Sequence, residues 1–124
     1  MNSRQALGRA AEAAAADYLR AAGWAILAHN VRVGRGELDL IMRRGRVLAF
    51  VEVKARCTAA CGRPEDAVGA RKRHQVGRLA ELWLASHPGA LIGVDDVRFD
   101  IVAVDAGHQP VLVRHLPAAF TLDA

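Results

Sequence analysis

Three charged residues interrupt two stretches that otherwise consist of core-type side chains. Asp39 lies within residues 36–41 (GELDLI), and Glu52 and Lys54 lie within residues 50–54 (FVEVK). Burying an isolated carboxylate or ammonium group costs several kcal/mol unless the group is paired or bound to a metal ion. These charges therefore predict a shared polar site in a mostly apolar sheet.

The chemistry that suits this trio is hydrolysis assisted by a divalent cation. Magnesium binds oxygen ligands, usually one or two carboxylates with water molecules. Such an ion lowers the pKa of a bound water and stabilises charge on a phosphoryl oxygen. A neighbouring lysine can orient the water and neutralise the charge that develops. Asp39, Glu52 and Lys54 thus suit a hard-cation site at which water could attack a phosphate group.

Two expected strands position these residues. Residues 37–42 alternate, with Glu37, Asp39 and Ile41 on one face, and residues 43–46 form a hairpin turn containing a glycine. Residues 47–55 place Glu52 and Lys54 on one face, roughly 6.6 Å apart along the strand. The hairpin therefore brings Asp39 beside the second strand.

The rest of the chain predicts a single domain, residues 1–124, of helices and strands. Helices are expected at 3–22 and 70–86, with the first ending at Gly23, and further strands at 24–28, 97–104 and 111–115; residues 30–36 form a loop or an irregular strand. The strand from 47, the second helix and the strand from 97 form a crossover unit, so these two strands should be parallel. The expected inward-facing residues are Leu7, Ala11, Ala14 and Tyr18 in the first helix, and Val76, Leu79, Ala80 and Trp83 in the second.

Composition narrows the function classes. The chain has a net charge of +4 and a pI near 9.8, which favours an anionic partner. Aromatic residues make up only 5%, which argues against a module that stacks single-stranded bases. No signal peptide or membrane span is recognisable, so we expect a cytoplasmic protein without a membrane partner. Cys57 and Cys61 lack matching zinc ligands and are expected to be free thiols.

Three segments resemble the YraN-like family of small bacterial proteins, within the PD-(D/E)xK nuclease superfamily. They are residues 36–41, residues 50–54 and Arg98-Phe99-Asp100. The resemblance runs along nearly the whole chain and also includes Gly8, Glu12, Asn30, Gly62, Pro64, Val68, Lys72 and Ala119-Phe120. The short Glu-x-Lys core is a weak signal by itself, whereas the ordered set along the chain is a strong one.

The resemblance implies a restriction-endonuclease-like α/β fold, with a mixed central sheet flanked by helices and related to archaeal Holliday-junction resolvases. It also implies a DNA endonuclease. Asp39, Glu52 and Lys54 match the superfamily pattern, and Glu12 matches a first-helix glutamate of resolvase-like relatives. Leu38 replaces the proline of the superfamily name, so Glu37 could share or replace Asp39 as a ligand.

The leading hypothesis is a metal-dependent endonuclease acting on branched or structured DNA. Asp39 and Glu52, with Glu12 as a tentative third ligand and the Val53 backbone carbonyl, would hold the ion, and Lys54 would activate the water. The residues expected to bind phosphates are Arg32, Arg35, Arg56, Arg71 and Lys72, with Gln75 in an accessory role. A homodimer would suit two cuts in a junction.

Two other classes fit the same residues. A nucleic-acid-binding module could retain the fold without cleaving anything, and an interaction scaffold could use the carboxylates only as ion-pair partners for Lys54. Asp100 is expected to make a structural hydrogen bond, and none of the five histidines is interpreted as a metal ligand.

Overall fold

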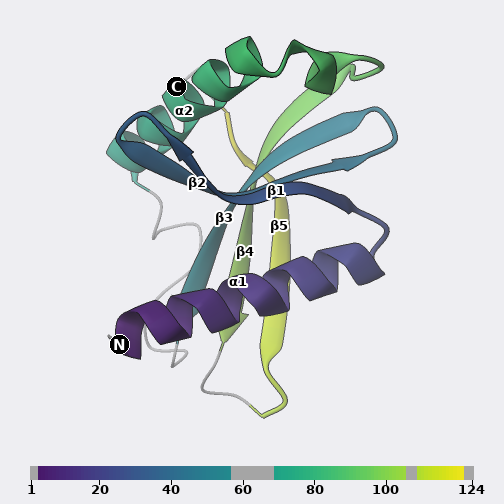
Figure 1. The fold of residues 1–124 in the computed structure, drawn as a ribbon. Helices are drawn as coiled ribbons and strands as arrows, with labels where there is room; N and C mark the ends of the chain where they lie inside the picture. Colours follow the sequence, from purple (N-terminus) through teal and green to yellow (C-terminus); the bar gives the residue numbers. More distant parts are fainter. Residues whose placement is uncertain (1–2, 57–68, 106–108, 122–124) are drawn as a thin grey trace.

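The computed structural model describes residues 3–56, 69–105 and 109–121 (Figure 1). Its helices are α1 (Ser3–Ala21), α2 (Ala70–Ser86) and a short 3₁₀ helix, η3 (Pro88–Leu91). Its strands are β1 (Ala25–Val33), β2 (Gly36–Arg44), β3 (Val47–Arg56), β4 (Asp96–Asp105) and β5 (Leu112–Phe120). None of the described helices is long and apolar enough to cross a membrane.

The strands form one mixed sheet in the order β1-β2-β3-β4-β5. β3 and β4 are parallel, which confirms the predicted crossover, and the other neighbouring pairs are antiparallel. The chain is therefore an α/β protein with a five-stranded mixed sheet between two helices, consistent with a restriction-endonuclease-like fold. Residues 57–68, which include both cysteines, lie outside the described part.

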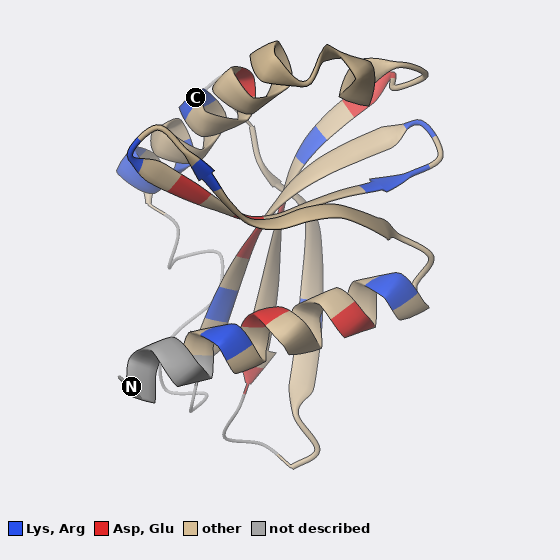
Figure 2. Ribbon diagram, viewed as in Figure 1, with Lys and Arg blue, Asp and Glu red and all other residues tan. Residues whose placement is uncertain are grey.

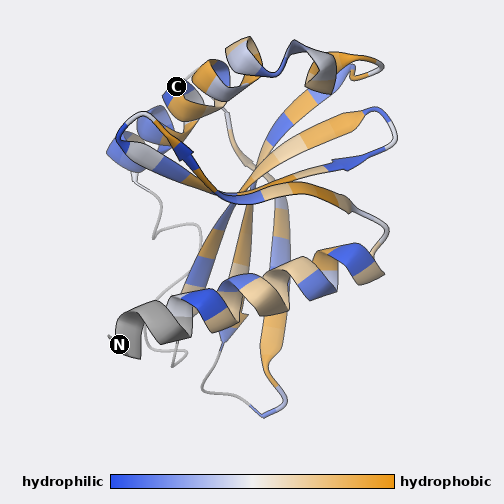
Figure 3. Cartoon of the chain, in the orientation of Figure 1, coloured by the Kyte–Doolittle hydropathy of each residue, from blue (hydrophilic) through white to orange (hydrophobic). Residues whose placement is uncertain are grey.

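Two apolar layers cover the sheet, one under each long helix. The α2 layer is centred on Phe50, whose ring lies 5.9 Å from that of Trp83 and 5.7 Å from that of Phe99. The α1 layer is built mainly from small and aliphatic side chains, among them Ala15 and Leu19. Figure 3 shows the resulting hydrophobic colouring along the central strands. Because both faces are covered, a charge within these strands is buried unless it lies near a strand end.

The inward faces of the helices were only partly predicted. In α2 the predicted residues Val76, Leu79, Ala80 and Trp83 are all buried. In α1 the buried residues are Ala11, Ala15, Ala16 and Leu19. Tyr18, predicted to face inward, is 43% exposed, because the helix turns its alanine-rich side to the sheet and its larger ring to solvent.

Both edge strands are longer than the sequence predicted. β1 continues through the segment left open as a loop or an irregular strand, with a register shift between Ile26 and Ala28 and a left-handed Asn30 at φ 52°. β5 continues past a second irregularity, where Ala118 has φ 50°. Gly23 ends α1 with φ 98°, as predicted. Irregular edge strands lose the strict alternation on which their prediction depends.

The central feature for function is a fork between β2 and β3. β2 pairs with β3 only from Leu40 to Arg44, whereas it pairs with β1 as far as Gly36. Figure 1 shows the β1–β2 hairpin curving away from the far half of β3 toward α2. At Gly36 the hairpin touches α2 closely, since an added Cβ would lie 2.6 Å from Leu79 Cδ1. Within the fork, the backbone groups of β2 and β3 do not pair with each other, so side chains can reach them instead.

Candidate metal and nuclease site

Asp39 occupies the fork, one residue beyond the last β2–β3 pair. Its Oδ2 accepts a hydrogen bond from the Val53 backbone N–H at 2.9 Å. The carboxylate therefore takes the place of the missing ladder partner on β2 and fixes its own position against β3. This geometry explains why a charged residue is tolerated between Leu38 and Leu40, which are both buried.

Three carboxylates gather at this point. Glu12 from α1 and Glu37 and Asp39 from β2 each offer an oxygen, and these oxygens lie within 4.8 Å of one another. With its amide nitrogen turned toward the acids, Asn30 of β1 donates to Glu12 and, at 3.1 Å, to Glu37. We call Glu12, Glu37 and Asp39 the acidic trio. Two elements, α1 and β2, thus supply the oxygen ligands, and β1 supplies the asparagine that links them.

The trio carries more negative charge than its surroundings neutralise. Partial burial, followed by the charges of Asp39 and Glu37, raises the pKa of Glu12 from its ordinary 4.5 to about 7, although Arg9 lowers it. At neutral pH a substantial fraction of Glu12 is therefore protonated. Crowded carboxylates that retain a proton are poised to exchange it for a cation.

Glu52 lies next to the trio without belonging to it. Its side chain is only 4% exposed. Burial, a hydrogen bond with the Asp39 carboxyl group and the charge of Asp39 raise the pKa of Glu52 to about 8, against the opposing effect of Lys72 and Lys54. Contact with a second carboxyl group thus favours the protonated form of Glu52. Asp39 links Glu52 to the trio.

The environment of Glu52 is incompletely satisfied. Lys72 Nζ from α2 lies 3.4 Å from Glu52 Oε1, which is an ion-pair distance. Yet Oε1 is buried and accepts no hydrogen bond from any described residue. Burying such an oxygen is costly, and the Lys72 ammonium offsets only part of that cost, since the pKa of Glu52 stays raised. The donor set, all oxygen and rich in carboxylates, fits a hard divalent ion such as Mg²⁺ or Mn²⁺.

Lys54 and Val53 are placed on β3 beside Glu52. Lys54 is half-buried, and its charge favours the ionised form of Glu52. Among the described residues it forms no ion pair within 4.0 Å, so Lys72, and not Lys54, is the direct partner of Glu52. For Val53 the observed contact is through its N–H to Asp39. Its predicted use of the carbonyl toward a metal stays a prediction.

The predicted phosphate-binding arginines lie around the fork. Arg32 and Arg35 are exposed at the β1–β2 hairpin, and Arg71 is exposed in the first turn of α2. Figure 2 shows these two basic segments next to each other, as the contact between Gly36 and Leu79 requires. The side chain of Arg56 lies outside the described part. A basic rim therefore flanks the acidic site on its α2 side.

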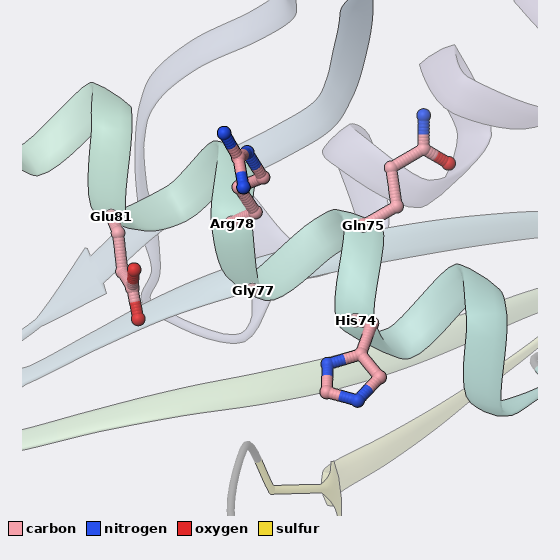
Figure 4. Close-up of a pocket in the computed structure, with 5 residues that line it drawn as sticks. All are labelled: His74, Gln75, Gly77, Arg78 and Glu81. Atoms are coloured by element: carbon pink, nitrogen blue, oxygen red, sulfur yellow. The ribbon is translucent and has the colours of Figure 1, made fainter.

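Gln75 lies on an exposed part of α2. It lines a shallow cavity of about 610 Å³ with His74, Gly77, Arg78 and Glu81 (Figure 4). In the described part of the chain it makes no hydrogen bond to the carboxylates. Its predicted accessory role therefore has no contact that supports it.

Asp100 belongs to a separate, structural cluster. It is fully buried, its Oδ2 lies 2.8 Å from Arg98 Nη2 and 2.7 Å from His115 Nε2, and its Oδ1 accepts the Ala118 N–H at 2.9 Å. Burial alone would raise the pKa of Asp100, but these hydrogen bonds outweigh it and hold the pKa below its ordinary 3.8. The expected structural hydrogen bond is thus observed, at the irregular part of β5.

Sequence reasoning missed two features of the site. Asn30 was noted only within the family resemblance, although an asparagine tolerates the left-handed backbone that turns it toward the acids. Lys72 was expected to bind phosphate, which stays a prediction, and its pairing with Glu52 was not foreseen. The signal for Lys72 was its position in the first turn of a helix that follows a buried strand, which could not specify a partner.

The chain matches the family described as "Uncharacterised protein family UPF0102" over residues 11–104. A UPF0102 protein of Anaeromyxobacter dehalogenans is 46% identical over 122 residues, covering 98% of this chain and 89% of that protein. One of Nocardia farcinica is also 46% identical, covering 97% and 93%. One of Syntrophotalea carbinolica is 42% identical, covering 97% and 95%.

The matches with these relatives cover nearly the whole chain and most of each relative, and the span matched by the family model, residues 11–104, contains the positions of the candidate site. The predicted YraN-like membership is confirmed. The chain belongs to the UPF0102 family.

Proposed function

We propose that this protein is a divalent-metal-dependent DNA endonuclease that hydrolyses phosphodiester bonds. The observation that carries the proposal is the convergence of Glu12, Glu37 and Asp39 within 4.8 Å, beside the buried Glu52 whose Oε1 accepts no hydrogen bond from a described residue. In a purely structural network we would expect cationic side chains to neutralise the carboxylates. Here the pKa values of Glu12 and Glu52 are instead raised to about 7 and about 8, so both acids retain protons at neutral pH.

The acidic trio, with Glu52 and the Val53 carbonyl as further candidates, would hold Mg²⁺ or Mn²⁺. The ion would supply a water of lowered pKa and neutralise charge on the phosphate. Lys54 is proposed to orient that water. Lys72, now opposite Glu52, is close enough to neutralise charge that develops at the same place.

The basic rim would hold the DNA backbone. Arg32, Arg35 and Arg71 are exposed near the fork, and arginine forms bidentate contacts with phosphates. The net charge of +4 supports an anionic partner. A branched or structured DNA is proposed as the substrate. Two chains acting together would provide two cuts in a junction. A sizing experiment on the protein bound to a junction would detect two bound chains.

Cleavage assays on four-way junction, flap and linear duplex DNA test the proposal. With Mn²⁺ present the wild type should give products on at least one substrate, and Asp39→Asn combined with Glu52→Gln should give none. Asp95→Asn is the matched control, because Asp95 is an exposed acid that pairs with Arg46 and lies outside the site. Salt-dependent binding without any metal-dependent product would instead favour a non-catalytic binding module.

A further inference from the structure

A second feature adjoins the acidic trio on the side opposite the predicted basic rim. A cavity of about 350 Å³ lies against α1, β1 and β2. Its polar lining consists of Arg9, Glu12, Asp17, Arg20, His29 and Asn30, and Leu40 and alanines of α1 complete the wall. We call it the α1–β1 pocket. Sequence reasoning assigned no role to Arg9, Arg20 or His29.

The pocket and the acidic trio share two residues. Glu12 belongs to the trio, and Asn30 donates to Glu12 and Glu37. A molecule in the pocket would therefore touch the same side chains that shape the candidate metal site. This continuity distinguishes it from the cavity on α2, where no member of the trio is among the lining residues.

The chemistry of the lining suits a nucleotide. Arg9 and Arg20 supply two guanidinium groups, and the only ion pair described for Arg20 is with Asp17 at 3.5 Å, where both side chains are more than half exposed. Such exposed pairs are worth little and exchange readily for a phosphate. Leu40 and the alanines of α1 give an apolar wall, and His29 offers a planar ring.

We propose that the α1–β1 pocket holds one unpaired nucleotide of the substrate strand, next to the phosphate at the acidic trio. The inference rests on the proposed function, because it places the substrate relative to that site. The volume lies at the low end of the roughly 300–1,000 Å³ range of ligand pockets. It can hold a single nucleotide, whereas a base pair attached to the rest of a duplex would not enter it.

The test measures binding of a ten-nucleotide single strand and of the matching duplex in EDTA, so that neither metal binding nor cleavage affects the result. Arg9→Gln with Arg20→Gln is compared with Arg78→Gln and Arg114→Gln, two exposed arginines outside the pocket that give the same change in charge. The logarithm of the binding constant falls linearly with the logarithm of the salt concentration. Each lost phosphate contact reduces the magnitude of this slope by about 0.7 for single strands.

We expect the pocket variant to reduce the magnitude of that slope by about 1.4 for the single strand. For the duplex we expect little change, and in the control variant we expect none. Three results would overturn the proposal that this pocket holds a nucleotide. They are an equal reduction of the salt slope in both double variants, an equal reduction for the duplex, and a wild type that does not bind the single strand. If binding depends on Arg9 and Arg20 but no substrate is ever cut, the pocket stands and the nuclease proposal fails.

Discussion

Glu52 is the residue whose protonation the fold controls most strongly. Its carboxyl group is buried against Asp39, and the charges of Lys72 and Lys54 do not offset the cost, so the pKa is raised to about 8. A raised carboxyl pKa means that the folded state binds a proton more tightly than the unfolded state. The stability it contributes is fully present below pH 4.5 and is lost as the pH rises through about 8.

Glu52→Gln should therefore stabilise the metal-free protein at high pH. Glutamine resembles the protonated acid, so we expect a gain on the order of 2–4 kcal/mol at pH 9 and little difference at pH 5. Urea unfolding in EDTA across this pH range measures it. A variant that is less stable than the wild type at pH 9 would mean that the ion pair with Lys72 dominates.

At this scale the sequence predicted that Asp39 and Glu52 would lie together but not how each would pair. The apolar neighbours of Asp39 and Glu52 marked both as unusual, and the hairpin brought them together. The roles of Glu37, Asn30 and Lys72 depend on the twist of the hairpin and on the docking of α2. No local pattern encodes those two features.

Among the elements, the fork between β2 and β3 creates the site. The part of β2 that precedes Leu40 is separated from β3 and rests on α2 at Gly36, where Leu79 fills the space that a side chain would need. The absence of a Cβ thus lets the hairpin approach the helix. That approach holds Glu37 and Asp39 at their present distance from β3.

Gly36→Ala should loosen this arrangement. The added methyl group would overlap Leu79, which is 7% exposed and has little room to move, so we expect a loss of about 1–2 kcal/mol in stability. Thermal unfolding measures it. Gly89→Ala is the control, since nothing lies within 4 Å of a Cβ placed there. Equal stability of the two variants would show that the hairpin does not depend on this contact.

The Asp100 cluster should hold β4 and the irregular β5 together. Asp100→Asn removes the charge that balances Arg98, so we expect a loss of about 3 kcal/mol, measured by urea unfolding at pH 7. Because the pKa of Asp100 is lowered, this contribution is present above its ordinary 3.8 and disappears as the pH falls below it.

Asp95→Asn is the matched control for this cluster. Asp95 pairs with Arg46 at 2.6 Å, but both side chains are more than half exposed. An exposed pair contributes about 0–1 kcal/mol. Equal losses in the two variants would contradict a special role for the buried pair.

The central strands, α2 and the parallel crossover followed from periodicity and connection rules, since each has a covered face and a strong repeat. The edge strands did not. A left-handed residue in each, Asn30 and Ala118, breaks the alternation that would have revealed their length. In α1 the many alanines allowed several inward faces, and packing chose one that leaves Tyr18 outside.

On the scale of the whole molecule, the candidate site lies where both helices approach one sheet. α1 contributes Glu12, the β1–β2 hairpin contributes Asn30, Glu37 and Asp39, and β3 and α2 contribute Glu52 and Lys72. Such a site exists only when the chain is folded. Any ion that binds it should therefore stabilise the fold.

Metal affinity should rise steeply with pH. The ion must displace protons from Glu12, with its pKa near 7, and from Glu52, with its pKa near 8. We expect Mn²⁺ to raise the unfolding temperature by several degrees at pH 8.5 and much less at pH 6, as measured by thermal scans with and without EDTA. A shift that is independent of pH would place the ion away from these two acids.

The most direct test of the account is calorimetric titration of Mn²⁺ into the metal-free protein at pH 8. We expect saturable binding in the wild type and in Asp95→Asn, and loss of that heat in Asp39→Asn. Absence of saturable heat in the wild type, or unchanged heat in Asp39→Asn, would contradict the assignment of the acidic trio as a metal site.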